Sequence, residues 1–114
     1  MKAAGAAAVD GALAALADPT RRAVIDLLRK GPRRAGELAD ALRLSPPALS
    51  RHLRVLRRSG LVVDDEPEHD ARVRLYRLRP EGFAPLHDWV GTVAALWQDQ
   101  LAAFKAHAEK GSKR

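Results

Sequence analysis

Three short breaks, each built around a proline, cut the first half of the chain into brief helical segments, and this spacing constrains the fold more than any other feature. Asp18-Pro19 is a helix start, because an Asp side chain can cap the first turn and proline fits the first helical position. Gly31-Pro32 ends that helix, and a short helix is expected over 35–42. Ser45-Pro46 then starts another helix, which ends at Gly60. Three helices with connections this short predict a helix-turn-helix.

Apolar residues recur at helical spacing in each segment and define the core that the three helices should share. The expected buried stripes are Val24, Ile25, Leu27 and Leu28, then Leu38, Ala39 and Leu42, then Leu49, Leu53 and Leu56. With 114 residues in all, we expect one domain over 1–114, in which 18–79 form the central unit.

A β-hairpin is expected directly after Gly60. Residues 61–63 begin a strand, residues 66–70 form an acidic turn, and residues 72–78 alternate basic with apolar side chains. We expect Val73, Leu75 and Leu78 to face the core, and Arg72, Arg74, Tyr76 and Arg77 to face outward or lie at the edges. A hairpin that follows the second helix of a helix-turn-helix is a wing, so the predicted fold is mainly α with a β-hairpin wing, an α+β winged helix-turn-helix.

The two ends of the chain predict a dimer. A weak helix is expected over 6–17, and after a short turn around Gly82 to Pro85 a helix of 81–109, of which about 24 residues would span about 36 Å. That length exceeds what a winged-helix core of this size can cover, so its apolar stripe needs a second copy. Intrachain packing of the two tryptophans is the alternative. The predicted dimer interface comprises Val9, Leu13, Leu16, Leu86, Trp89, Val90, Val93, Trp97, Leu101 and Phe104.

Charge and composition narrow the partners and the chemistry. The chain carries a net charge of +6, and residues 21–60 concentrate basic side chains, which suits a polyanion such as nucleic acid; a solvated arginine surface is the alternative. The absence of cysteine excludes disulfides, thiolate metal sites and cysteine nucleophiles. No phosphate loop, nucleophile elbow or carboxylate pair on apolar elements is present, so neither an enzyme nor a cofactor is predicted.

The helix after Ser45 presents candidates for reading bases. Its leucine stripe leaves Pro47, Ser50, Arg51 and Arg54 on the opposite side. Ser50 can bond to a base edge, and Arg51 has the fork geometry for guanine, while Pro46 and Pro47 offer apolar contact to thymine methyl groups. The predicted contacts to the DNA backbone are Arg33, Ser45, His52, Arg54 and Arg57.

Residues 44–62 resemble the recognition helix of the ArsR family of bacterial winged-helix repressors. Residues 17–22 and 36–39, Asp70-Ala71-Arg72 and Tyr76 are also similar to that family. The resemblance implies a homodimeric repressor that binds an inverted repeat of double-stranded DNA in its own promoter, with Arg72 and Arg74 in the minor groove. The last helix is most similar to a subgroup that lacks the cysteine metal box and is often encoded beside a START-like ligand-binding protein.

The four histidines, His52, His69, His87 and His107, show no metal-binding spacing. A family metal site bridges the paired last helices, but Asp88 and Glu109 do not reproduce its ligand pattern, so no metal is predicted. We expect a cytoplasmic, nucleoid-associated bacterial protein without a membrane segment. The inducer is left open between a small molecule, a partner protein and none. The rival functions are a winged-helix module that binds an acidic protein and an architectural DNA binder.

Overall fold

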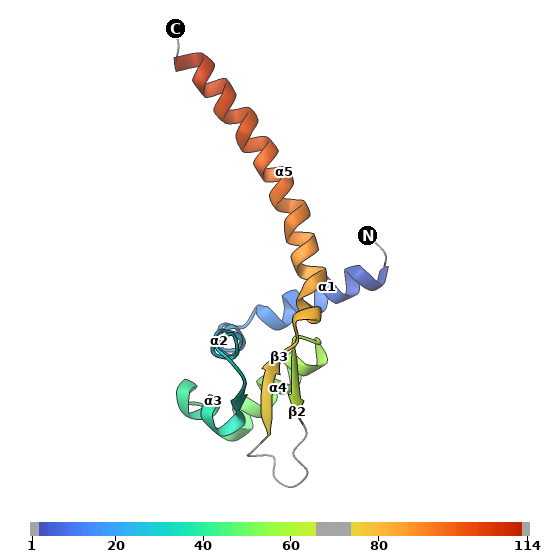
Figure 1. The fold of residues 1–114 in the computed structure, drawn as a ribbon, viewed down its shortest axis with the longest axis vertical. Helices are drawn as coiled ribbons and strands as arrows, with labels where there is room; N and C mark the ends of the chain where they lie inside the picture. Colours follow the sequence, from blue (N-terminus) through green and yellow to red (C-terminus); the bar gives the residue numbers. More distant parts are fainter. Residues whose placement is uncertain (1–2, 66–73, 113–114) are drawn as a thin grey trace.

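The computed structural model describes residues 3–65 and 74–112, and the predicted order of elements is present with one added strand (Figure 1). The elements are α1 (Ala3–Leu16), α2 (Pro19–Leu28), β1 (Arg33–Arg34), α3 (Ala35–Leu42), α4 (Pro46–Arg58), β2 (Val62–Asp65), β3 (Leu75–Leu78) and α5 (Pro80–Ser112). Helices α2 to α4 surround one face of the small sheet, and α5 projects away from it (Figure 1).

Local side-chain chemistry sets the helix ends, as predicted. The Asp18 carboxylate accepts hydrogen bonds from the amides of Thr20 and Arg21 at 2.7 and 3.1 Å, so it caps α2. Ser45 Oγ accepts from the amide of Ala48 at 3.3 Å and caps α4. Beyond α4, Gly60 has a φ of +79°, a left-handed conformation that favours glycine and turns the chain into β2.

The core lies between the helix-turn-helix and the sheet. Its buried members are Ala12, Ala15, Val24, Ile25, Leu28, Leu38, Ala39, Leu49, Leu53, Leu56, Leu61, Val62 and Tyr76. Burial of each leucine contributes about 1.5–3 kcal/mol to stability. The predicted stripes are confirmed apart from Leu27 and Leu42, which are only partly buried.

The phase predicted for the second wing strand is wrong. Tyr76 is 7% exposed and belongs to the core, whereas Leu75, which was expected inside, is only partly buried. Side chains alternate along a strand, so the inward position of Tyr76 also turns Leu78 toward the core, where it packs as predicted. Val73, also expected inside, lies outside the described residues.

The sheet has three strands rather than the two expected. Its order is β1-β3-β2, and both pairings are antiparallel, with Arg33 opposite Tyr76 and Val62 opposite Leu78. β3 is therefore the central strand, and α2 packs on it where Tyr76 joins the core. The two-residue strand β1 was not predicted, since it is too short to show an alternating pattern.

The last helix begins earlier than predicted. Residues 82–85, which were expected to form a turn, are helical. Helix α5 starts at Pro80, runs for 33 residues and includes Pro85. Pro85 lacks an N–H and so removes one helical hydrogen bond, but the helix continues through it. Gly82 permits this start, because a Cβ there would lie 1.9 Å from the carbonyl oxygen of Gly60. No helix in the described ranges combines the length and apolarity needed to cross a bilayer.

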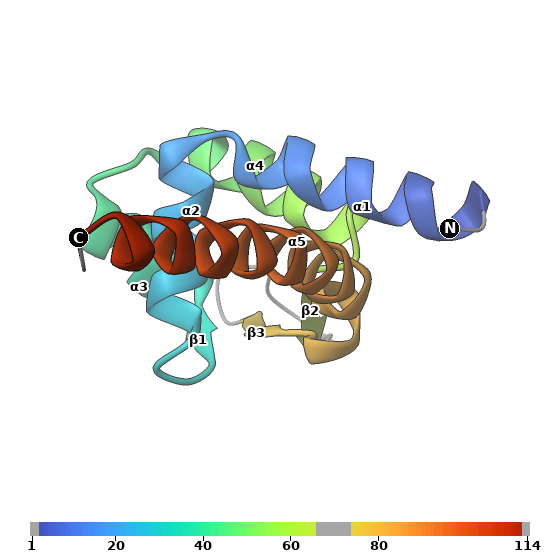
Figure 2. The same ribbon diagram turned by 90° about the horizontal axis from the view of Figure 1, so that it is seen from above.

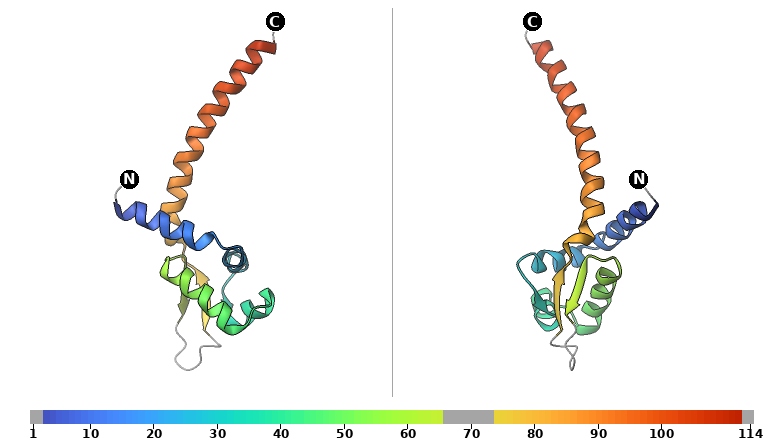
Figure 3. Two further views of the ribbon diagram at one scale, coloured as in Figure 1. Left: turned by 180° about the vertical axis from the view of Figure 1, so that it is seen from behind. Right: turned by 45° about the vertical axis from the view of Figure 1, so that its right-hand side comes forward.

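Helix α1 is longer than the predicted 6–17 and crosses the first turns of α5 (Figures 2 and 3). Its inner face consists of small residues, Ala12 and Ala15, together with Val9, and all three are buried within the chain. Leu13 is 43% exposed. Of the three α1 residues predicted to meet a second copy, Leu13 thus has the most surface free.

Candidate nucleic-acid interface

Helix α4 is amphipathic, and its exposed side is the candidate reading surface. Leu49, Leu53 and Leu56 are buried and fix the helix to the core. The exposed residues over 46–54 are Pro46, Pro47, Ser50, Arg51 and Arg54. The structure thus brings the four predicted base-reading residues together at an exposed helix N-terminus, the end of a recognition helix that enters a major groove.

The turn between α3 and α4 orients this surface. Arg43 has a φ of +54° in the left-handed region, and the amide of Leu44 donates to the carbonyl oxygen of Ala39 at 2.9 Å, which ends α3. Only three residues, 43–45, separate the two helices. A connection this short places α4 across α3 and leaves the N-terminus of α4 open to solvent.

A cluster of arginines lies at the end of α4. Arg54, Arg57 and Arg58 line a shallow depression of about 370 Å³. Arg54 and Arg57 were predicted to contact phosphates, whereas Arg58 was not singled out. Three cations around one depression suit an anion. Residues 54, 57 and 58 are three and four positions apart and so lie on one side of a helix, and this spacing could have identified Arg58 from the sequence.

Asp64 in β2 pairs with two arginines of the candidate surface. Its carboxylate lies 3.4 Å from Arg57 Nη1 and 3.2 Å from Arg74 Nε, and its side chain is only 14% exposed. Arg74 Nε is buried and makes no aligned hydrogen bond, so its contact with Asp64 is ionic in character. Asp64 therefore holds a helix arginine and a wing arginine together.

The other predicted contacts are dispersed. Arg33 lies half-buried in the edge strand β1, and Ser45 is exposed at the α4 N-cap. Arg72 and the residues 70–71 that precede it lie outside the described residues. Arg77 faces away from the core and pairs with Asp65 at 3.5 Å. Of the two predicted wing arginines, the structure therefore places Arg74 alone.

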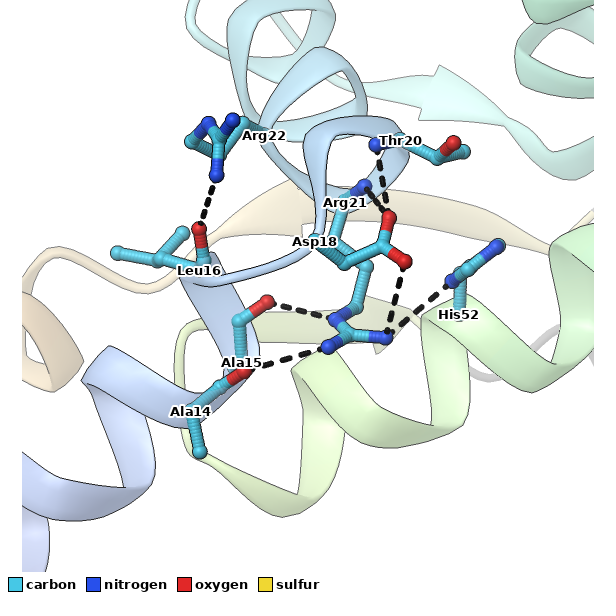
Figure 4. A network of polar contacts seen from close by, with 8 residues as sticks. All are labelled: Ala14, Ala15, Leu16, Asp18, Thr20, Arg21, Arg22 and His52. Atoms are coloured by element: carbon cyan, nitrogen blue, oxygen red, sulfur yellow. Dashed lines mark hydrogen bonds and ion pairs between the residues drawn. The ribbon is translucent and has the colours of Figure 1, made fainter.

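His52 lies on the inner side of α4 and takes part in a polar network with α1 and α2 (Figure 4). Its Nδ1 is 3.5 Å from Arg21 Nη1. Arg21 also donates from Nε to the Ala15 carbonyl oxygen at 2.6 Å and from Nη2 to that of Ala14 at 3.2 Å. The amide of Arg21, which donates to Asp18, holds the pKa of that carboxyl below its usual value. The predicted backbone contact His52 is thus half-buried and occupied by Arg21 in the free protein.

A hollow of about 380 Å³ separates α3 from α4 on the side of the reading helix. It is lined mainly by apolar residues of both helices, with Ser50 at its edge and Tyr76 from β3 on its wall. The candidate base reader Ser50 therefore stands beside an open space rather than packed against a neighbour.

The three described histidines, His52, His87 and His107, form no recognisable metal centre. Among residues 3–65 and 74–112, no three His, Asp or Glu side chains lie together as a metal site. His87 Nδ1 lies 3.5 Å from Asp88 Oδ1, and both side chains are exposed. His69 lies outside the described residues.

A helix-turn-helix, a hairpin wing and a basic reading helix define the class: a winged-helix DNA-binding transcriptional regulator. A family model described as bacterial regulatory protein, arsR family, matches residues 18–63. The HTH-type transcriptional regulator Rv2034 of Mycobacterium tuberculosis is 49% identical over 77 residues, 68% of this chain and 69% of that protein.

Further relatives agree with this assignment. The transcriptional repressor SdpR of Bacillus subtilis is 40% identical over 50 residues, 44% of this chain and 56% of that protein. A crystal structure of an ArsR family transcriptional regulator superposes with a TM-score of 0.70 at 33% identity, covering 80% of this chain and 91% of that one. The chain belongs to the ArsR family, as its resemblance predicted, and the members of this family are transcriptional regulators rather than enzymes.

Proposed function

We propose that this chain is a homodimeric repressor that binds an inverted repeat in promoter DNA, including its own promoter. Residues 18–79 form the DNA-binding core, and the helices over 6–17 and 81–109 form the dimer. The observation that carries the proposal is the exposed N-terminus of α4, where Ser50 and Arg51 project opposite a buried leucine stripe. The relative SdpR is itself named a repressor.

The charges support a division of labour on the DNA. Ser50 and Arg51 read base edges in the major groove, with Pro46 and Pro47 beside them. The phosphates are held by Arg33, Ser45, Arg54 and Arg57, while His52 stays with Arg21, and the wing arginines Arg72 and Arg74 enter the minor groove. Eight phosphate contacts per dimer predict a slope of about −7 for log K against log salt concentration.

The apolar surface of α5 supports the dimer. Its outer turns expose large hydrophobic side chains to solvent, namely Leu96, Trp97, Leu101 and Phe104. Such a continuous exposed stripe marks an interaction site. A second copy of α5 fits it, because a two-fold axis lets the same stripe cover itself. Leu86 packs partly against the chain's own core, so the stripe is most open beyond it.

The test is a fluorescence anisotropy titration against the DNA upstream of the protein's own gene and against a scrambled duplex, at about 150 mM salt. Specific binding should exceed non-specific binding by at least about 10³-fold. Equal, weak binding to both duplexes would contradict the repressor proposal. It would favour a winged-helix module whose basic surface binds an acidic protein.

A further inference from the structure

The reading helix has little direct packing against the helices proposed to form the dimer. Within the described residues, α4 packs on α2, α3 and β2, while α1 packs on α5 and on α2, and no comparable packing joins α4 directly to α1 or α5. The position of α4 relative to α1 and α5 is therefore set indirectly, by the core that α1 and α4 share and by the few polar contacts that bridge the two groups of helices.

One bridge lies at the C-terminal end of α4. The Arg79 amide donates to the Leu61 carbonyl oxygen at 2.9 Å, and Arg79 Nη1 donates to that of Gly60 at 3.3 Å. Gly82 of α5 approaches the same carbonyl so closely that a Cβ would not fit. These contacts tie the start of α5 to the two residues that follow α4 and its cap.

The other bridge is Arg21 of α2, which meets α4 at His52, midway along that helix (Figure 4). Its guanidinium donates to the carbonyl oxygens of Ala14 and Ala15 at the end of α1, and it meets His52 Nδ1 at 3.5 Å. An arginine stays protonated, so neutral His52 accepts through Nδ1 when its proton is on Nε2. The Arg21 side chain is 17% exposed and also lies 3.9 Å from Asp18, which limits its freedom.

The buried leucine stripe holds α4 in the core, and the two polar bridges add a direct link from α4 to α1 and to the start of α5. If the Arg21 bridge is lost, α4 can tilt with its core relative to α1, about the contacts at Gly60, and Ser50 lies about 15 Å from Gly60 along the helix. A rotation of about 10° then moves Ser50 by about 2.5 Å, close to the spacing of about 3.4 Å between successive bases. The support at His52 thus controls where the reading end lies.

We infer that Arg21 is a positioning residue that sets the separation of the two reading helices, and thereby the half-site spacing that the dimer accepts. The inference rests on the proposed homodimer and its inverted repeat. Arg21 touches no DNA in this scheme; it acts through the orientation of α4 relative to α1.

Arg22 provides a matched control. Its Nη1 donates to the Leu16 carbonyl oxygen at 2.7 Å, so it also binds the end of α1, but it makes no hydrogen bond or ion pair with α4 in the part of the chain that the structure describes. Arg21→Gln and Arg22→Gln remove the same charge from adjacent positions. Should Arg21→Gln fail to fold, Arg21→Lys serves instead, because an ammonium keeps the charge but cannot span three acceptors as the planar fork does.

The first measurement needs neither DNA nor a dimer. The chain has no cysteine, so Ala8→Cys with Ser50→Cys gives two unique spin-label sites, one on α1 and one on α4. Pulsed electron paramagnetic resonance on protein diluted with unlabelled chains reports the distance within one chain. Arg21→Gln should broaden that distance distribution about two-fold, and Arg22→Gln should not. An unchanged width in Arg21→Gln overturns the inference.

The second measurement uses unlabelled full-length protein and inverted repeats whose centre is lengthened or shortened by one or two base pairs. Wild type and Arg22→Gln should lose about tenfold in affinity away from the best spacing, and Arg21→Gln about two- to threefold, with binding to a single half-site unchanged. A wild-type spacing profile in Arg21→Gln, or an equal loss on every duplex, overturns the inference. If the wild-type protein itself shows no preferred spacing, the proposed binding to an inverted repeat is wrong, and so is the role of Arg21 in spacing. The widths of the spin-label distance distributions then still show whether Arg21 holds α4 relative to α1.

Discussion

Arginines on the proposed DNA surface differ in how freely they can meet a phosphate. Arg51 and Arg54 are exposed and have no ion pair within the described residues, so their guanidinium groups are available. Arg57 and Arg74 share Asp64 and must exchange that carboxylate for DNA. The formal charge of a surface therefore overstates the charge that it offers to a ligand.

Arg51 and Arg54 should respond differently to substitution, because one is proposed to read a base and the other a phosphate. Arg51→Ala should weaken operator binding by about 1–3 kcal/mol and relax specificity at one base position, whereas Arg54→Ala should weaken all sequences alike. Anisotropy titrations with the operator, single-base variants and a scrambled duplex measure both effects. Equal losses on cognate and scrambled DNA in both variants would show that the base-reading assignment is wrong.

Asp64→Asn should release Arg57 and Arg74 and increase binding to DNA of any sequence. Each cation that gains a phosphate makes the slope of log K against log salt steeper by about 0.9, so a change of about 1–2 is expected. The measurement is a salt series with scrambled duplex. Asp26→Asn is the control, since Asp26 pairs with Arg29 on the exposed side of α2 at 3.6 Å and its substitution removes the same charge elsewhere. An identical slope for the two variants would contradict this role of Asp64.

At the scale of the elements, features encoded within a few residues could be predicted, and features that depend on packing could not. The caps Asp18 and Ser45 act on amides two or three residues away, so their helix starts were predicted correctly. Tyr76 was misplaced because an alternating strand has two phases, and only the packing of the helices on one face of the sheet shows which one is buried. The early start of α5 depends on the approach of Gly82 to Gly60, which are distant in sequence.

Gly82 and Gly91 lie in the same helix, but substitution by alanine should change the free energy of unfolding in opposite directions at the two positions. Gly82→Ala places a methyl group 1.9 Å from the Gly60 oxygen, so backbone must shift and unfolding should become easier by several kcal/mol, about 2–4. A Cβ added at Gly91 would meet nothing within 4 Å beyond its chain neighbours and the nearby backbone of its own helix, so Gly91→Ala should stabilise the helix by about 0.5–1 kcal/mol. Urea denaturation followed by circular dichroism gives both values, and a neutral Gly82→Ala would refute the close packing of α5 on Gly60.

At the scale of the whole molecule, one chain is strongly elongated, with extents of 72 × 33 × 20 Å. The elongation comes from α5, whose outer turns extend beyond the rest of the chain (Figure 1). The sequence pattern predicted an apolar stripe on this helix, and the structure shows that its own chain leaves Trp97 62% exposed. Helical periodicity predicts that α5 has an apolar stripe. It does not show which surface packs against that stripe, because the same repeat occurs whether the stripe meets its own chain, a second copy or another protein.

Trp97→Glu should therefore separate the proposed dimer without destabilising the single chain. Burial of a large apolar side chain is worth about 1.5–3 kcal/mol, and a two-fold interface contains each residue twice, so the dimer should weaken by about 3–6 kcal/mol. Sedimentation equilibrium over a concentration series measures this loss, with Gln98→Glu as a control that adds the same charge one residue further along α5. The variant should also bind a full inverted repeat no more tightly than a single half-site. A wild-type protein that remains monomeric at every concentration would rule out the dimer, and the exposed stripe would then belong to a different partner.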